Sequence, residues 1–112
     1  MDKTVLDNLI VELKRGTQVL AVLSQLKKNQ YGYSLLQALE EKNVFIEPGT
    51  LYPLMRRLES QGLLVSKWDT TESRPRKYYK LSEEGLNTYA LLIKEWQQMT
   101  DEMNRLLVED QK

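Results

Sequence analysis

The chain has 112 residues, which is the size of one compact domain. Sixteen Lys and Arg residues balance sixteen Asp and Glu residues, so no overall positive charge points to a nucleic-acid or membrane partner. The absence of Cys and His excludes a disulfide framework, a Cys-ligated zinc site and the commonest general base, so we expect no enzyme, cofactor or metal. No apolar run reaches the roughly 18 residues of a membrane span, and Asp7 and Glu12 interrupt any signal-like segment, so a cytoplasmic protein without a membrane partner is expected.

Two helices are predicted at the start of the chain. Apolar residues at helical spacing from Val5 to Leu13 predict an amphipathic helix that Thr4 caps and Gly16 ends. Thr17 is predicted to cap a second helix that continues to about Lys28. Apolar side chains cover most of the circumference of this second helix, so we expect it to lie centrally.

A third helix opens at Tyr31-Gly32-Tyr33 and is expected at the surface, with one leucine-rich face. A fourth helix follows and ends at Gly62. If it begins at Pro48, Pro53 removes a backbone hydrogen bond inside it. If Thr50 is the N-cap, Pro53 falls in the first turn, where proline is tolerated, and this second start is preferred.

From Leu64 onward the apolar period changes to two, which predicts a hairpin of residues 64–68 and 77–81 around a turn-rich tip. Tyr78 and Tyr79 alternate between its faces, so one of them is expected to pack on the helices. Ser82 is predicted to cap a last helix of about 25 residues. The fold class is therefore mainly α with a small β-hairpin. It is a winged helix-turn-helix domain over residues 1–81 and a C-terminal dimerisation helix over residues 82–112.

The charges are distributed unevenly along the chain. Residues 48–80 contain seven Lys and Arg against three acidic residues, a net charge of plus four. Residues 81–112 contain three basic and seven acidic residues, a net charge of minus four. The neutral total therefore combines a basic fourth helix and hairpin with an acidic last helix.

Four stretches spanning about half the chain carry a family resemblance: Tyr31-Gly32-Tyr33, residues 48–59 with Gly-Thr-Leu-Tyr-Pro, Gly62-Leu63-Leu64, and residues 74–85 with Arg-Lys-Tyr-Tyr. Together they resemble the PadR family of bacterial winged-helix transcriptional repressors, and the length resembles the shorter PadR-like subgroup. The resemblance implies a homodimer bound to double-stranded DNA at an inverted-repeat operator, with the fourth helix in the major groove and the wing tip over the flanking minor groove. Many relatives place a glycine near the wing tip, where this chain has Ser73 before Arg74.

Carried over to this sequence, the resemblance gives seven candidate operator contacts: Thr50, Tyr52, Arg56, Arg57, Arg74, Arg76 and Lys77. Physically, the hydroxyls of Thr50 and Tyr52 can donate to phosphate near a helix start, and the wing cations can reach phosphates or a narrow minor groove. The alternatives are a half-buried packing role for Tyr52 and a solvated, solubilising turn for the wing tip. A winged-helix protein-protein interaction module without ligand sensing is the rival function.

The last helix carries an apolar stripe too wide for a small winged core to cover. A second copy is therefore expected to cover it, together with the first helix. The predicted homodimer interface consists of Leu6, Leu9, Ile10, Leu13, Leu86, Ile93, Trp96, Met103 and Leu107.

Trp96 lies in the middle of this stripe, where two-fold symmetry brings it near its counterpart. One interpretation is plain interface packing, since aromatic residues and Met are common there. The other is a cavity that binds a planar aromatic effector, lined by Trp96, Tyr89, Ile93, Met99, Thr100 and Met103. The resemblance favours an effector, because several relatives regulate multidrug exporters or phenolic-acid detoxification by binding such compounds. Release of the repressor from DNA by the effector is the expected response.

Overall fold

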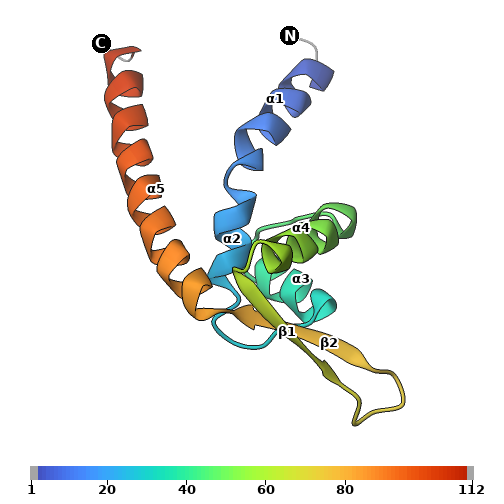
Figure 1. The fold of residues 1–112 in the computed structure, drawn as a ribbon. Coiled ribbons are helices and arrows are strands. Elements are labelled where there is room, and N and C mark those ends of the chain that lie inside the picture. Colours follow the sequence, from blue (N-terminus) through green and yellow to red (C-terminus); the bar gives the residue numbers. More distant parts are fainter. Residues whose placement is uncertain (1–2, 111–112) are drawn as a thin grey trace.

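The computed structural model describes residues 3–110. Residues 1–2 of the predicted winged domain and residues 111–112 of the predicted C-terminal helix lie outside the described residues. Five helices and one hairpin follow in the order α1 (Lys3–Arg15), α2 (Gln18–Ser24), α3 (Gly32–Glu40), α4 (Pro48–Ser60), β1 (Leu64–Asp69), β2 (Arg76–Leu81) and α5 (Glu83–Asp110) (Figure 1). This order confirms the predicted winged-helix fold class with its long C-terminal helix. No helix among the described residues is long and apolar enough to cross a membrane.

The hydrophobic core lies where α2, α3, α4 and the base of the hairpin meet. Val22, Leu23 and Leu26 at the centre are fully buried, which confirms the central position predicted for the second helix. Leu35 and Leu39 from α3 and four apolar residues of α4 pack around them. The second helix ends at Ser24, earlier than the predicted Lys28, and the side chain of Thr17 does not cap it. The Thr17 hydroxyl instead donates to the carbonyl of Lys14, at the bend between α1 and α2.

The start of α4 differs from the preferred prediction. The helix begins at Pro48 with Glu47 as its N-cap, so Pro53 lies inside it and the preference for Thr50 as the N-cap was wrong. The amides of Thr50 and Leu51 both donate to the Glu47 carbonyl, which forms the first turn before Pro53 is reached. Because proline has no amide N–H, the hydrogen bond from position 53 to the carbonyl of Gly49 is missing, and α4 loses one backbone bond at its exposed start.

The hairpin pairs Leu64 with Leu81 at its base and Asp69 with Arg76 at its far end. Its base is joined to the segment before α3, because the backbones of Gln30 and Tyr79 exchange two hydrogen bonds of 3.0 and 2.8 Å. The sequence pattern had not predicted this third pairing. Tyr79 is buried in the core, as expected for one of the two tyrosines, while the half-buried Tyr78 packs edge-on against Tyr31 at 5.4 Å.

A tight junction joins the turn after α4 to the start of α5. The predicted cap is confirmed: the Ser82 hydroxyl oxygen accepts the amide of Gly85 at 2.9 Å, and the hydroxyl donates to the carbonyl of Gly62 at 2.7 Å. Gly62 has a φ of +82°, which ends α4 and turns the chain into β1. A Cβ added at Gly85 would lie 2.0 Å from the carbonyl oxygen of Leu63, so only glycine permits this approach.

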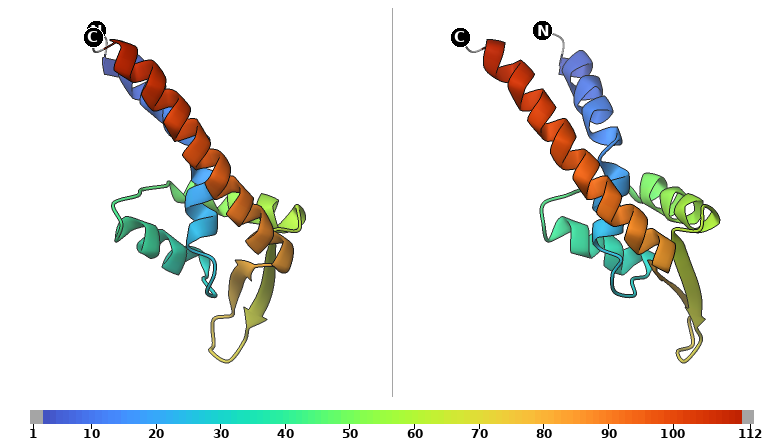
Figure 2. Two further views of the ribbon diagram at one scale, coloured as in Figure 1. Left: turned by 90° about the vertical axis from the view of Figure 1, so that its left-hand side faces the viewer. Right: turned by 60° about the vertical axis from the view of Figure 1, so that its left-hand side comes forward.

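The first and last helices project together from the winged core and lengthen the molecule to 60 × 34 × 24 Å. They rise on the same side of the core in Figures 1 and 2, and Figure 1 shows them diverging toward the two termini. No described residue of α1 is buried. On α5, half-buried Tyr89 and Leu92 pack against the core, while the apolar residues from Trp96 onward are exposed.

One carboxylate links α4 to both strands of the wing. Glu59 accepts a hydrogen bond from the Ser66 hydroxyl of β1 and pairs with the ammonium of Lys77 of β2 at 3.1 Å. The Ser66 hydrogen bond, followed by the Lys77 ammonium, lowers the pKa of Glu59 below its ordinary value of 4.5, although partial burial opposes this. The hydrogen bond to Glu59 correspondingly raises the pKa of Lys77.

We therefore expect Glu59→Gln to destabilise the protein by about 0.5 to 1 kcal/mol at neutral pH, the usual range for a partly exposed ion pair. A carboxylate whose pKa is lowered by folding stabilises the native state above its unfolded pKa, and this stability is lost as the pH falls through the folded-state pKa. In urea denaturation the difference from wild type should thus begin to shrink as the pH falls below about 4.5, and it should vanish only below the lowered folded-state pKa of Glu59. Glu72→Gln, at the exposed wing tip, is the control; equal effects of the two variants would contradict the link.

Candidate nucleic-acid interface

The exposed edge of α4 carries three of the predicted contact residues. Leu51, Leu54, Met55 and Leu58 face the core, which leaves Thr50, Arg56 and Arg57 exposed. Within residues 3–110, the guanidinium groups of Arg56 and Arg57 have no ion pair or hydrogen bond to another side chain. Helix α4 therefore presents two adjacent cations that no described residue of its own chain neutralises.

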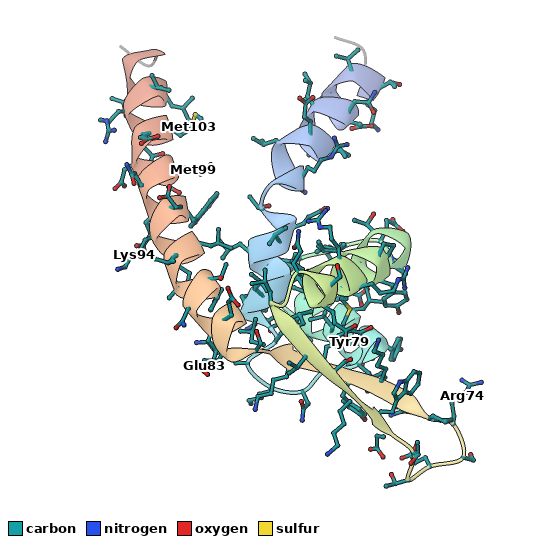
Figure 3. All side chains as sticks on the ribbon, viewed as in Figure 1. Arg74, Tyr79, Glu83, Lys94, Met99 and Met103 are labelled. Carbon is teal, nitrogen blue, oxygen red and sulfur yellow. The ribbon has the colours of Figure 1, made fainter. Side chains whose placement is uncertain are left out.

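The wing tip is shaped by an aspartate rather than by a glycine. The carboxylate of Asp69 accepts hydrogen bonds from the amide and the hydroxyl of Thr71 at 3.0 and 2.7 Å, an arrangement typical of an Asx turn. These bonds, the backbone one first, lower the pKa of Asp69. Arg74 follows on this loop and extends away from the helices (Figure 3). It forms no ion pair among the described residues, so its charge is available at the outermost part of the molecule.

The other two wing cations lie on β2 near the far end of the hairpin and are held by neighbouring side chains. The guanidinium of Arg76 lies 4.5 Å from the centre of the Tyr31 ring, a cation-π contact to the residue that precedes α3. Lys77 is paired with Glu59, and its ammonium also lies 5.1 Å from the ring of Tyr79. The structure therefore separates the three predicted wing contacts into one free cation, one stacked cation and one paired cation.

An open hollow of about 370 Å³ lies between the wing, the start of α3 and α4, and we call it the wing-side hollow. Its lining is aromatic and basic, without an acidic residue: Tyr31, Gly32, Tyr33, Tyr52, Met55, Arg56, Trp68, Pro75, Arg76, Lys77 and Tyr79. Predicted contacts from α4 and from the wing thus border one basic depression.

Tyr52 has the half-buried packing role that was the alternative to DNA contact. A Cβ at Gly32 would lie 2.6 Å from a carbon of the Tyr52 ring, so the ring rests directly on the first turn of α3. The Tyr52 side chain also lines the wing-side hollow, so packing on α3 and contact with a ligand in the hollow are compatible. Gly32 is needed here because the ring occupies the space of a side chain.

Three residues of this surface were missed by the sequence reasoning. Tyr31 supports Arg76, Trp68 lines the wing-side hollow, and Glu59 was counted only as a charge. The register Trp68 to Lys77, readable from a hairpin alignment, could have indicated Trp68. The partners of Tyr31 and Glu59 are 45 and 18 residues distant along the chain, a separation that no local pattern reveals.

The residues predicted for an effector site and a dimer interface differ in their environment. Tyr89 is half-buried against the core, Ile93 is half-buried as well, and the Lys27 ammonium lies 5.5 Å from the Tyr89 ring centre. Trp96, Met99 and Met103 are 44 to 57% exposed, and Figure 3 shows Met103 on the side of α5 that faces α1. The Thr100 hydroxyl donates to the Trp96 carbonyl at 2.8 Å. The remaining predicted interface residues, Leu6, Leu9, Ile10, Leu13, Leu86 and Leu107, are all exposed.

Three similarities to known proteins agree with this architecture. A crystal structure of a PadR family transcriptional regulator from Eggerthella lenta is 47% identical, with a TM-score of 0.87 over 93% of each chain. The transcriptional regulator Rv3488 of Mycobacterium tuberculosis is 36% identical over 66% of this chain and 70% of its own. Bacillus subtilis PadR in complex with operator DNA shares the fold, with a TM-score of 0.62 and 19% identity over 67% of this chain and 46% of that one.

Residues 19–91, more than half of the sequence, match the model of the transcriptional regulator PadR-like family. The match covers the whole winged core and the first part of α5. The Eggerthella lenta structure and Rv3488 are both described as transcriptional regulators. The chain therefore belongs to the PadR-like family of transcriptional regulators.

Proposed function

We propose that the protein is a homodimeric repressor that binds an inverted-repeat operator in the cytoplasm and responds to a planar aromatic effector. Residues 1–81 would read the DNA, and residues 82–112 would pair the two copies. The observation that carries the proposal is the basic edge formed by Arg56, Arg57 and Arg74, whose charges have no partner among residues 3–110. With this basic edge turned toward the DNA, α4 would enter the major groove and Arg74 would approach the flanking minor groove.

The rival function is a winged helix that only binds other proteins. This function gives no role to the cations gathered on α4 and the wing. It predicts no specific, salt-dependent binding to DNA. A repressor instead neutralises phosphates with these cations, and each such contact adds about 0.9 to the slope of log affinity against log salt.

We expect Arg74→Ala to lower this slope by about one unit and to weaken binding to the upstream region of its own gene. Lys77→Ala should change the slope by less than half as much, because its ammonium is already paired with Glu59 at 3.1 Å. Fluorescence anisotropy over a salt series measures both slopes. A slope for Arg74→Ala that equals wild type would refute the wing assignment.

Dimerisation is supported by the apolar residues of α1 and α5 that the chain leaves exposed. Leu9, Ile10 and Leu13 on α1, and Trp96, Met103 and Leu107 on α5, range from 38 to 78% exposed. Monomeric proteins rarely leave a contiguous apolar surface of this kind, so a second copy is its most economical cover. Two-fold symmetry would also set two α4 helices on successive turns of DNA.

Leu9→Glu should therefore weaken the dimer by tenfold or more, about 1.4 kcal/mol, because it places a charge within the apolar interface. Val11→Glu is a matched control: Val11 is equally exposed at 57% against 52%, but it lies two positions, about 200°, further around the helix. Sedimentation equilibrium measures both. A monomeric wild type, or identical behaviour of the two variants, would reject the interface.

The effector proposal rests on the position of Trp96 between the core and the free end of α5. Trp96 is 44% exposed, and Met99 and Met103 beyond it offer flexible, polarisable side chains that suit a flat apolar compound. The Ser82 junction ties the start of α5 to the turn after α4. A compound that changes the angle between paired α5 helices would thus move both recognition helices, and it alters DNA affinity only by its preference for one arrangement.

Planar aromatic cations or phenolic acids should quench tryptophan emission saturably, and Trp96→Phe should abolish most of this quenching. Trp68→Phe is the control, since Trp68 lies on the wing, far along the chain from the proposed site. Emission titrations of both variants distinguish the two rings. Quenching that survives in Trp96→Phe and disappears in Trp68→Phe would place the compound at the wing instead.

A further inference from the structure

A second basic hollow, of about 410 Å³, lies on the other side of α4. It is formed by the end of α1, the start of α2 and residues 49–57 of α4, and we call it the α1-side hollow. Its lining consists of Arg15, Gln18, Val19, Gly49, Thr50, Pro53, Leu54 and Arg57. The sequence reasoning assigned no function to Arg15 or to this side of α4.

The α1-side hollow contains two positive charges and no negative charge. Arg15 and Arg57 both line it, and the remaining lining residues are neutral. Within the part of the chain that the structure describes, neither guanidinium has an ion pair or a side-chain hydrogen bond. Two uncompensated like charges at one depression attract an external anion, and the guanidinium fork is suited to phosphate oxygens.

The two hollows lie on opposite flanks of α4. Arg56 lines the wing-side hollow and Arg57 lines the α1-side hollow, because consecutive helical residues point about 100° apart. A helix inserted in the major groove has one phosphate backbone on each side, across a groove about 12 Å wide. The basic flanks of α4 therefore match the two strands of one duplex.

We propose that the α1-side hollow binds a backbone phosphate of the operator strand opposite the strand that the wing contacts, and that Arg15 is its main contact residue together with Arg57. This inference rests on the proposed function, since it requires α4 to enter the major groove. It extends the DNA-binding surface beyond α4 and the wing to the end of α1.

Arg15 stays accessible in the proposed dimer. It follows Leu13 by two positions, about 200° around the helix, and so points away from the face that carries Leu6, Leu9 and Ile10. A second copy packed on that face would leave Arg15 free to contact DNA.

Arg15→Gln tests the inference, with Lys14→Gln as the matched control. Both substitutions remove one positive charge from the last turn of α1, but Lys14 lines a different hollow, beside Phe45. Arg15→Gln should lower the salt slope of DNA binding by about one unit, whereas Lys14→Gln should leave it near wild type. Phosphate ethylation interference should show contacts on both strands for wild type, and for Arg15→Gln the interference at the phosphates on the α1 side should weaken while that on the wing side persists.

Each other outcome has a distinct meaning. Salt-dependent binding by wild type, with equal slopes for the two variants, overturns this inference alone. Wild-type binding that does not depend on salt overturns the proposed function and this inference with it. Inorganic pyrophosphate serves as a probe of a free anion: if it raises the Tm of wild type but not of Arg15→Gln while the DNA slopes coincide, the hollow binds a soluble phosphate and the DNA assignment is wrong.

Discussion

The close approach of Gly85 to the carbonyl of Leu63 is the constraint on which the relative placement of the main parts depends. At this point the end of α4, the base of β1 and the start of α5 meet, and the Ser82 hydroxyl bonds to both sides of the junction. A larger residue at position 85 would force α5 away from the winged core. The long helix is therefore joined to the core through a close-packed, hydrogen-bonded junction rather than through a flexible linker.

The surface on the wing side of α4 is built by contacts that fix its cations in different ways. Tyr31 stacks under Arg76, Glu59 pairs with Lys77, and Asp69 shapes the loop that carries Arg74. Only part of the positive charge on this surface is thus free to neutralise an anion. Counting basic residues overestimates such an interface, because some of them hold the scaffold together.

The elements themselves could be predicted because their signals are local. The period of two from Leu64, the cap at Ser82 and the apolar circumference of the second helix depend on neighbouring residues, and the structure confirms all three. The start of α4 was mispredicted because only the backbone hydrogen bond that Pro53 removes was considered. The hydrogen bonds from the Thr50 and Leu51 amides to the Glu47 carbonyl, which form the first turn, were not taken into account. The pairing of Gln30 with Tyr79 and the two hollows depend on tertiary contacts between distant segments, so the sequence pattern could not indicate them.

The exposure of α1 links the helical order of this segment to the concentration of the protein. None of its described residues is buried against its own chain, so packing within one copy contributes little to keeping α1 helical. In the proposed homodimer, the free energy that orders this segment would come from association, and such a contribution grows with protein concentration. Local order in α1 would then depend on the abundance of the protein, so dilution would weaken assembly and the order of this helix together.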